Sequence, residues 1–193
     1  MEKKLTIQDI LSNGVTLGLK NFVSLIGCVV LYVLTCWIPY INIGTTIAMA
    51  CLPLEMAKGT VISPTAIFDK KYFKYIGEYF LIEAFIFMGV LVGTFFFFIP
   101  GMVIAIAWSL GVLIMIDKGV NPLEALTMSN KATTGYKWTI FLSQLVLSVA
   151  LGILNLLFGF LGIIGVILML IVVILVVPII LGMTAYIYSK LVG

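Results

Sequence analysis

Six runs of apolar residues divide the chain, at residues 22–38, 43–54, 78–98, 102–116, 139–158 and 166–188. A membrane-spanning helix needs about 20 mostly apolar residues. Residues 139–189 contain no charged side chain, which leaves room for two such helices and a turn. We therefore predict an all-α integral membrane protein with six transmembrane helices. The fourth run has 15 residues and would cover only about 22 Å, so it is short for a hydrocarbon core of about 30 Å.

Short turns join these runs in pairs, and a polar segment precedes each pair. The turns lie at Pro39, at Pro100 and at residues 159–165, and the polar segments are residues 6–20, 60–75 and 117–138. In the first polar segment Ile10, Gly14 and Gly18 share one helical face, which is typical of an amphipathic helix at a membrane interface. The pattern predicts three hairpins, each preceded by a cytoplasmic interfacial helix.

Two of the polar segments contain a helix-start signal. Asn121 is suited to cap a helix, Pro122 to the first helical position, and Glu124 falls where its side chain can reach back to the backbone N–H of the cap. Ser63 followed by Pro64 repeats the order of cap and proline. We expect a helix to begin at each of these two sites.

The recurring order of elements suggests an internal repeat within one membrane domain, residues 1–193. The segments that begin at Thr6, Ser63 and Asn121 align with starts 57 and 58 residues apart, which gives units 6–59, 63–119 and 121–190. A Lys-Gly pair at residues 58–59 precedes the second unit and another at residues 118–119 precedes the third. The alternative is that any six-span protein with short outer turns shows hairpins of similar length.

Composition excludes a water-soluble fold, because 63% of the residues are hydrophobic and only 10% are charged. All eleven cationic residues are lysines, and each lies in the N-terminal segment, one of the two long connections or the C-terminal end. Because positively charged loops stay in the cytoplasm, both termini and both long connections are predicted there. The expected location is the cytoplasmic membrane.

The chain contains no histidine, the commonest general base and metal ligand, so no activated serine or cysteine nucleophile of the usual kind is available. Cys28, Cys36 and Cys51 lie in apolar runs without metal-site spacing and are expected to be small buried residues. The prediction is a protein that is not an enzyme and binds no cofactor or metal.

Polar residues inside the predicted spans indicate a first functional hypothesis. Glu83, Ser109, Gln144 and Asn155 lie on three different predicted spans, with the last two on the same one, and would line a path for a solute or ion if they converged, with a homo-oligomer as one arrangement. For Glu83 the alternative is a structural carboxylate that pairs with a lysine of the nearby connection.

Cationic and aromatic residues at the predicted membrane boundary indicate a second hypothesis, a lipid-binding or scaffolding protein. Lys70, Lys71 and Lys74 would contact anionic headgroups, and Lys137 with Trp138 is a pair typical of the boundary. The alternative is that these lysines only determine topology. Binding of nucleic acid is not expected, because the net charge of +3 is located at the membrane.

Residues 121–126, Ser129 and residues 135–138 resemble the "P-x-E-A-L-x-x-S…G-x-x-W" segment of a broad, mostly bacterial group of six-span proteins. That group includes the membrane domain fused to some glycerophosphodiester phosphodiesterases. Residues 98–101 and Pro178 with Tyr186 and Tyr188 resemble other parts of it, so that the likeness covers about residues 95–190. The chain differs in having no arginine and no soluble phosphodiesterase domain. The resemblance implies an architecture and a membrane location, but no reaction.

Overall fold

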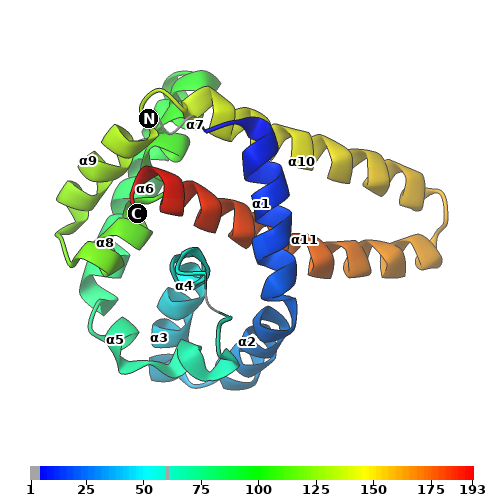
Figure 1. Ribbon diagram of the computed structural model, residues 1–193, viewed down its shortest axis with the longest axis horizontal. Helices are drawn as coiled ribbons and strands as arrows, with labels where there is room; N and C mark the ends of the chain where they lie inside the picture. The colour runs from blue at the N-terminus through cyan, green and yellow to red at the C-terminus, as the bar shows by residue number, and fades with distance from the viewer. Residues whose placement is uncertain (1–4, 60) are drawn as a thin grey trace.

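The computed structural model describes residues 5–59 and 61–193, and every regular element in them is a helix (Figure 1). The prediction of an all-α protein is therefore confirmed. In chain order the elements are α1 (Ile7–Lys20), α2 (Phe22–Thr35), α3 (Pro39–Ala50), α4 (Leu52–Ala57), the 3₁₀ helix η1 (Pro64–Phe68), α5 (Lys70–Phe73), α6 (Ile76–Phe96), α7 (Phe98–Trp108), α8 (Gly111–Lys118), α9 (Pro122–Thr133), α10 (Lys137–Gly159) and α11 (Ile163–Leu191).

Among the described residues, four helical segments are long and apolar enough to cross a membrane: α6, α7 with α8, α10 and α11. Helices α1 and α2 are together also long and apolar enough, but they meet at an angle of 65°. The predicted six spans are thus not confirmed. The reason lies in the first hairpin, where α2 has 14 residues and covers only about 21 Å, and its return is divided into α3 and α4.

The divided return helix has a local cause. Pro53 has no backbone N–H, so a helix continuing from α3 would lose the bond from residue 53 to the carbonyl of Met49. The chain instead breaks at Cys51, whose N–H bonds to the carbonyls of Ile47 and Ala48. The span predicted at residues 43–54 is therefore two short helices.

Each polar segment packs against a hairpin of another part of the chain. Helix α1 lies on α11, η1 lies on α2 and α3, and α9 lies on α7 and α8. Figure 1 shows α9, α5 and α1 around the outside, with α4 in the middle. The second and third polar segments each contact the hairpin that precedes them in the chain. The first segment has no preceding hairpin and contacts the last one, so the three contacts form a closed cycle.

The core lies where α4, α8 and the end of α11 meet. A hydrogen bond from the hydroxyl of Tyr188 to a carboxylate oxygen of Asp117, 2.6 Å long, joins α11 to α8. Large side chains fill this region and are almost fully buried, among them Leu52, Met56, Leu113, Ile114, Met115 and Ile187.

The predicted helix at residues 6–20 is confirmed as α1, with the Thr6 hydroxyl accepting a bond from the Asp9 N–H at 3.1 Å. The apolar face predicted to meet lipid is covered by α11. A Cβ atom at Gly18 would lie 2.5 Å from the carbonyl oxygen of Pro178, so only glycine permits this approach.

The cap at Asn121 is also confirmed, with Pro122 in the first helical turn and the Asn121 side chain accepting from the Glu124 N–H at 2.9 Å. The Glu124 carboxylate accepts from the side-chain amide of Asn121, at 3.3 Å, and the predicted bond to the cap's backbone N–H is not seen. Ser63 precedes a 3₁₀ helix that Pro64 opens, and its side chain makes no cap bond. Its hydroxyl lies 2.9 Å from that of Thr65.

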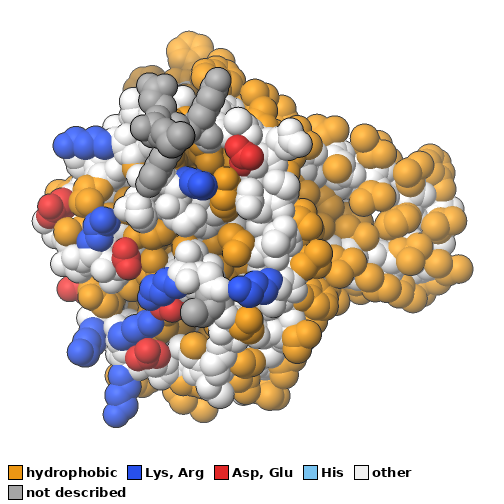
Figure 2. Space-filling view, viewed as in Figure 1, with side chains coloured by type: hydrophobic (Ala, Val, Ile, Leu, Met, Phe, Trp, Pro, Cys, Tyr) orange, Lys and Arg blue, Asp and Glu red, His pale blue; other side chains and the backbone are white. Residues whose placement is uncertain are grey.

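The hairpin of α10 and α11 projects from the rest of the protein (Figure 1). Figure 2 shows hydrophobic side chains and no charged side chain on the visible surface of this arm, whereas the charged side chains gather over the body. This distribution fits a protein whose arm lies in lipid and whose charged face meets water.

Candidate functional site

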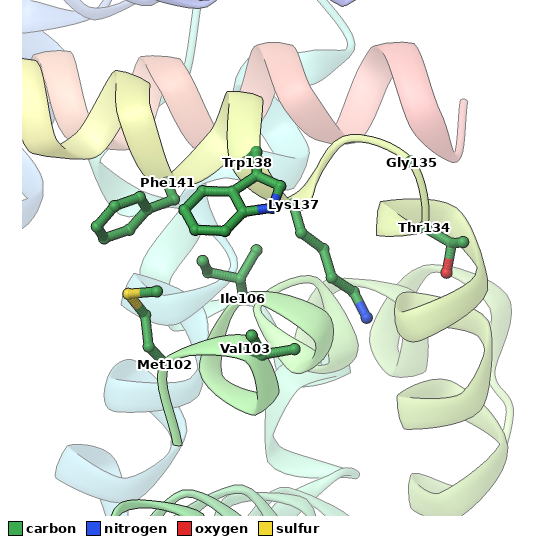
Figure 3. A pocket seen from close by; sticks show the side chains of 8 residues that line it. All are labelled: Met102, Val103, Ile106, Thr134, Gly135, Lys137, Trp138 and Phe141. Carbon is green, nitrogen blue, oxygen red and sulfur yellow. The ribbon is translucent and has the colours of Figure 1, made fainter. Parts of the chain in front are cut away.

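A cavity of about 300 Å³ lies between α7, the end of α9 and the start of α10 (Figure 3). Its walls are hydrophobic and its rim is polar. Figure 3 shows side chains of α7 facing the aromatic rings of α10, with Trp138 above Ile106. The lining residues are Met102, Val103, Ile106, Thr134, Gly135, Lys137, Trp138 and Phe141.

The turn between α9 and α10 positions the rim. Gly135 has a φ of +88°, a left-handed conformation that glycine adopts without steric cost. The turn lets α10 begin at Lys137, and the two side chains that follow then point apart (Figure 3). Trp138 covers the apolar wall and meets the Phe141 ring edge-on, with centroids 5.9 Å apart. The lysine extends toward α9.

The ammonium group of Lys137 donates a hydrogen bond to the side-chain oxygen of Asn130, 2.8 Å away. Asparagine is neutral, so this contact orients the ammonium without compensating its charge. In the described part of the chain the ion pairs involve Lys58 and Lys71, and none involves Lys137. Lys137 thus brings to the cavity lining a positive charge that has no carboxylate partner among the described residues.

The three lysines predicted to contact headgroups differ from one another. Lys71 bonds to Glu55 at 2.8 Å and lies 3.6 Å from Asp69, so its charge is compensated within the protein. Lys70 and Lys74 are exposed, and no ion pair of either is found in the residues that the structure describes. Only these two remain available to headgroups.

The ion pairs of Lys71 and Lys58 with Glu55 also shift the pKa values of Glu55 and Lys71. Burial opposes ionisation of Glu55, but hydrogen bonds from Lys71 and Lys58 outweigh burial and hold the pKa of this carboxyl below its usual range. Burial alone would lower the pKa of Lys71, and its bond to Glu55 instead raises that pKa. The pair therefore stays charged at neutral pH and fixes α5 against the end of α4.

The four polar residues proposed to line a path do not share one cavity. Gln144 lines a cavity of about 270 Å³ between α10 and α11, and Asn155 lines a separate one near the tip of the same hairpin. Glu83 is half-buried on α6, and Ser109 donates to the carbonyl of Ile106 at 2.8 Å. No metal-binding group of three or more Cys, Asp or Glu residues occurs among the described residues.

Ser129 has a structural role that the pattern did not reveal. It is fully buried, and its hydroxyl donates to the carbonyl of Ala107 at 2.7 Å and accepts from the N–H of Leu110 at 3.2 Å. It thereby enters the break between α7 and α8, where no proline occurs. Thr133 contributes a longer contact to Ala107, at 3.5 Å. The only sequence signal was the place of Ser129 in the segment that resembles other membrane proteins.

No family model, no curated protein and no solved structure matches the chain. The resemblance to the membrane domain of glycerophosphodiester phosphodiesterases therefore stays a prediction.

Proposed function

We propose that this protein is a multi-pass membrane protein that binds an anionic phospholipid in the cavity between α7 and α10. The phosphate contacts the ammonium of Lys137, and an acyl chain lies along Ile106, Met102 and Phe141 under the indole of Trp138. The polar rim and the apolar wall match the two parts of such a lipid.

The observation that carries this proposal is that Lys137, whose ammonium has no ion-pair partner among the described residues, lines an otherwise apolar cavity. An apolar cavity alone would accept any hydrophobic molecule. A lysine alone would attract any anion or only determine topology. Together they select a molecule with both features, and lysine near an anionic leaflet contributes about 1 kcal/mol to such binding.

Passage of a solute or ion has less support. The centre of the protein is filled by buried side chains of α4, α8 and α11, such as Met56 and Ile114. The polar residues suited to a path lie apart, and Gln144 and Asn155 are exposed on the projecting hairpin. A path would therefore need an arrangement of several copies.

For the topology we propose six crossings in three hairpins, with both termini on the cytoplasmic side of the cytoplasmic membrane and with a threefold internal repeat. The closed cycle of contacts supports this arrangement, since each polar segment has the same relation to its neighbouring hairpin. Gly59 and Gly119 support it further, because both end a return helix with a positive φ, +76° and +63°. The short first hairpin would require the bilayer to thin around it.

Native mass spectrometry of the detergent-purified protein tests the lipid proposal. Phosphatidylglycerol and phosphatidylcholine with the same chains are added in turn, and retained lipid is compared between the unmodified protein and Lys137→Gln. We expect phosphatidylglycerol to be preferred, and Lys137→Gln to lose about fivefold in its retention, the equivalent of 1 kcal/mol.

Lys131→Gln is the matched control, because it removes the same charge from an exposed position on α9 outside the cavity lining. It should retain phosphatidylglycerol as the unmodified protein does. Equal retention of the two lipids, or equal losses in the two variants, would refute the proposal.

A further inference from the structure

A second apolar cavity, of about 720 Å³, lies on the other side of α7. Helix α6 supplies one wall, α7 supplies another, and α9 closes it with a polar residue at its edge. Its lining includes Phe85, Val92, Ile104, Trp108, Thr127 and Asn130.

The two cavities are separated by the width of α7. Successive residues of an α-helix are turned by about 100°, so Val103 and Ile106 face one side while Ile104 and Trp108 face the other. Where α9 crosses α7, the hydroxyl of Ser129 holds the two helices together. Each cavity thus has α7 as a wall, with the turn after α9 at the edge of the first and α9 itself at the edge of the second.

One polar contact connects the two cavities. Asn130 lines the second cavity, Lys137 lines the first, and their side chains are hydrogen-bonded at 2.8 Å. The Asn130 oxygen accepts this bond, so its amide N–H groups remain as donors in addition to those of the ammonium. A single phosphate at this point would therefore meet donors from both sides of α7.

We infer that the lipid is a diacyl phospholipid that straddles α7, with its phosphate on Lys137 and Asn130 and one acyl chain in each cavity. The inference rests on the proposed function and adds that both chains are recognised. In a diacyl lipid one headgroup leads to two apolar chains, which matches one cationic contact between two apolar cavities. A single-chain lipid would fill only one of them.

The tryptophans allow each cavity to be observed separately, since Trp138 lines the first and Trp108 the second. The remaining tryptophan, Trp37, is 85% exposed, and both Trp37 and Trp108 are replaced by phenylalanine so that Trp138 alone is observed. A variant with Trp138 as its sole tryptophan is titrated in detergent with brominated phosphatidylglycerol and, separately, with its brominated single-chain analogue. Quenching of Trp138 reports occupancy of the first cavity, and brominated phosphatidylcholine measures the unspecific background.

Thr127→Phe in this variant places a bulky ring in the lining of the second cavity. We expect half-maximal quenching of Trp138 by the diacyl lipid to need a lipid concentration at least about fivefold higher. The reason is that the added ring and the second acyl chain would compete for the same space. Quenching by the single-chain lipid should not change, which also shows that the first cavity is intact. Thr184→Phe is the control, because Thr184 likewise bonds to the carbonyl four residues earlier but lines a different cavity.

If Thr127→Phe leaves the diacyl titration unchanged while Lys137→Gln weakens both titrations, the two cavities are independent and the inference is wrong. The proposed function would then stand. If Lys137→Gln alters neither titration, the proposed function fails, and the inference fails with it.

Discussion

Replacing Ser129 by alanine should destabilise the protein through the break between α7 and α8. The hydroxyl supplies the acceptor for the Leu110 N–H and a donor for the Ala107 carbonyl, at 3.2 and 2.7 Å. Ser129 is fully buried, so water does not replace it readily. In the alanine variant the Leu110 N–H loses this partner, and Ala107 retains only the 3.5 Å contact to Thr133.

The expected cost follows from these two groups. A buried donor or acceptor left without a partner costs about 1–3 kcal/mol. With one group fully deprived and the other still in a long contact, we expect a loss of about 2–4 kcal/mol in the free energy of unfolding. For a chain of this size the loss corresponds to a fall of about 4–15 °C in the unfolding temperature.

Thermal unfolding in detergent, followed by circular dichroism, measures this loss. Thr127→Ala is the control, because Thr127 lies two residues away on α9 and its hydroxyl is exposed. Removal of that hydroxyl should alter stability by less than about 0.5 kcal/mol. A Ser129→Ala protein that unfolds at the same temperature as the control would show that the helix break does not depend on this hydroxyl.

Two further changes test the packing and the charges. Gly18→Ala should lower the free energy of unfolding by about 1–3 kcal/mol, because the new Cβ meets backbone atoms of Pro178 and Ile179. Gly77→Ala, where a Cβ meets nothing within 4 Å, should not lower it, and equal losses would contradict the close approach of α1 to α11. The pKa of Glu55 is lower in the folded protein than in the unfolded chain, where it is about 4.3. The ionised Glu55 carboxylate therefore stabilises the fold above about pH 4.3, and this stabilisation is lost as the pH falls through the folded pKa. Urea unfolding should therefore show Glu55→Gln to be less stable than the unmodified protein at pH 7, with a difference that shrinks below pH 4.3, and a constant difference would refute the ion pair.

Local chemistry predicted the helix starts well. At Thr6 and Asn121 a side chain that accepts a backbone N–H lies next to the first helical residue, so the sequence alone specifies where α1 and α9 begin. The same reasoning was less accurate at Ser63. Three residues after Pro64 the chain is still in a 3₁₀ helix, and α5 begins only after Asp69, which caps it instead.

Hydropathy predicted the apolar segments but not their continuity. The break between α7 and α8 is contacted by Ser129, which comes 19 residues after the Leu110 to which it is hydrogen-bonded. A contact over this distance along the chain leaves no trace in the local pattern of apolar residues. For the same reason the sequence predicted only the polar part of the candidate site and not its apolar wall. Lys137 and Trp138 were found as a boundary pair, whereas the wall formed by Ile106 depends on how α10 packs on α7.

The helix break and the cavity proposed to hold lipid are connected through α9. Ser129 fixes α9 to the end of α7, and the next residue along, Asn130, holds the ammonium of Lys137 at the cavity mouth. If the Ser129 hydroxyl is removed, α9 is less firmly held, and the lysine loses its fixed position relative to the apolar wall of α7. Because pre-ordering of a charged side chain lowers the entropy cost of binding, phosphatidylglycerol retention should fall together with stability in Ser129→Ala. A buried serine that lines neither cavity would thus contribute to binding through the position of one lysine.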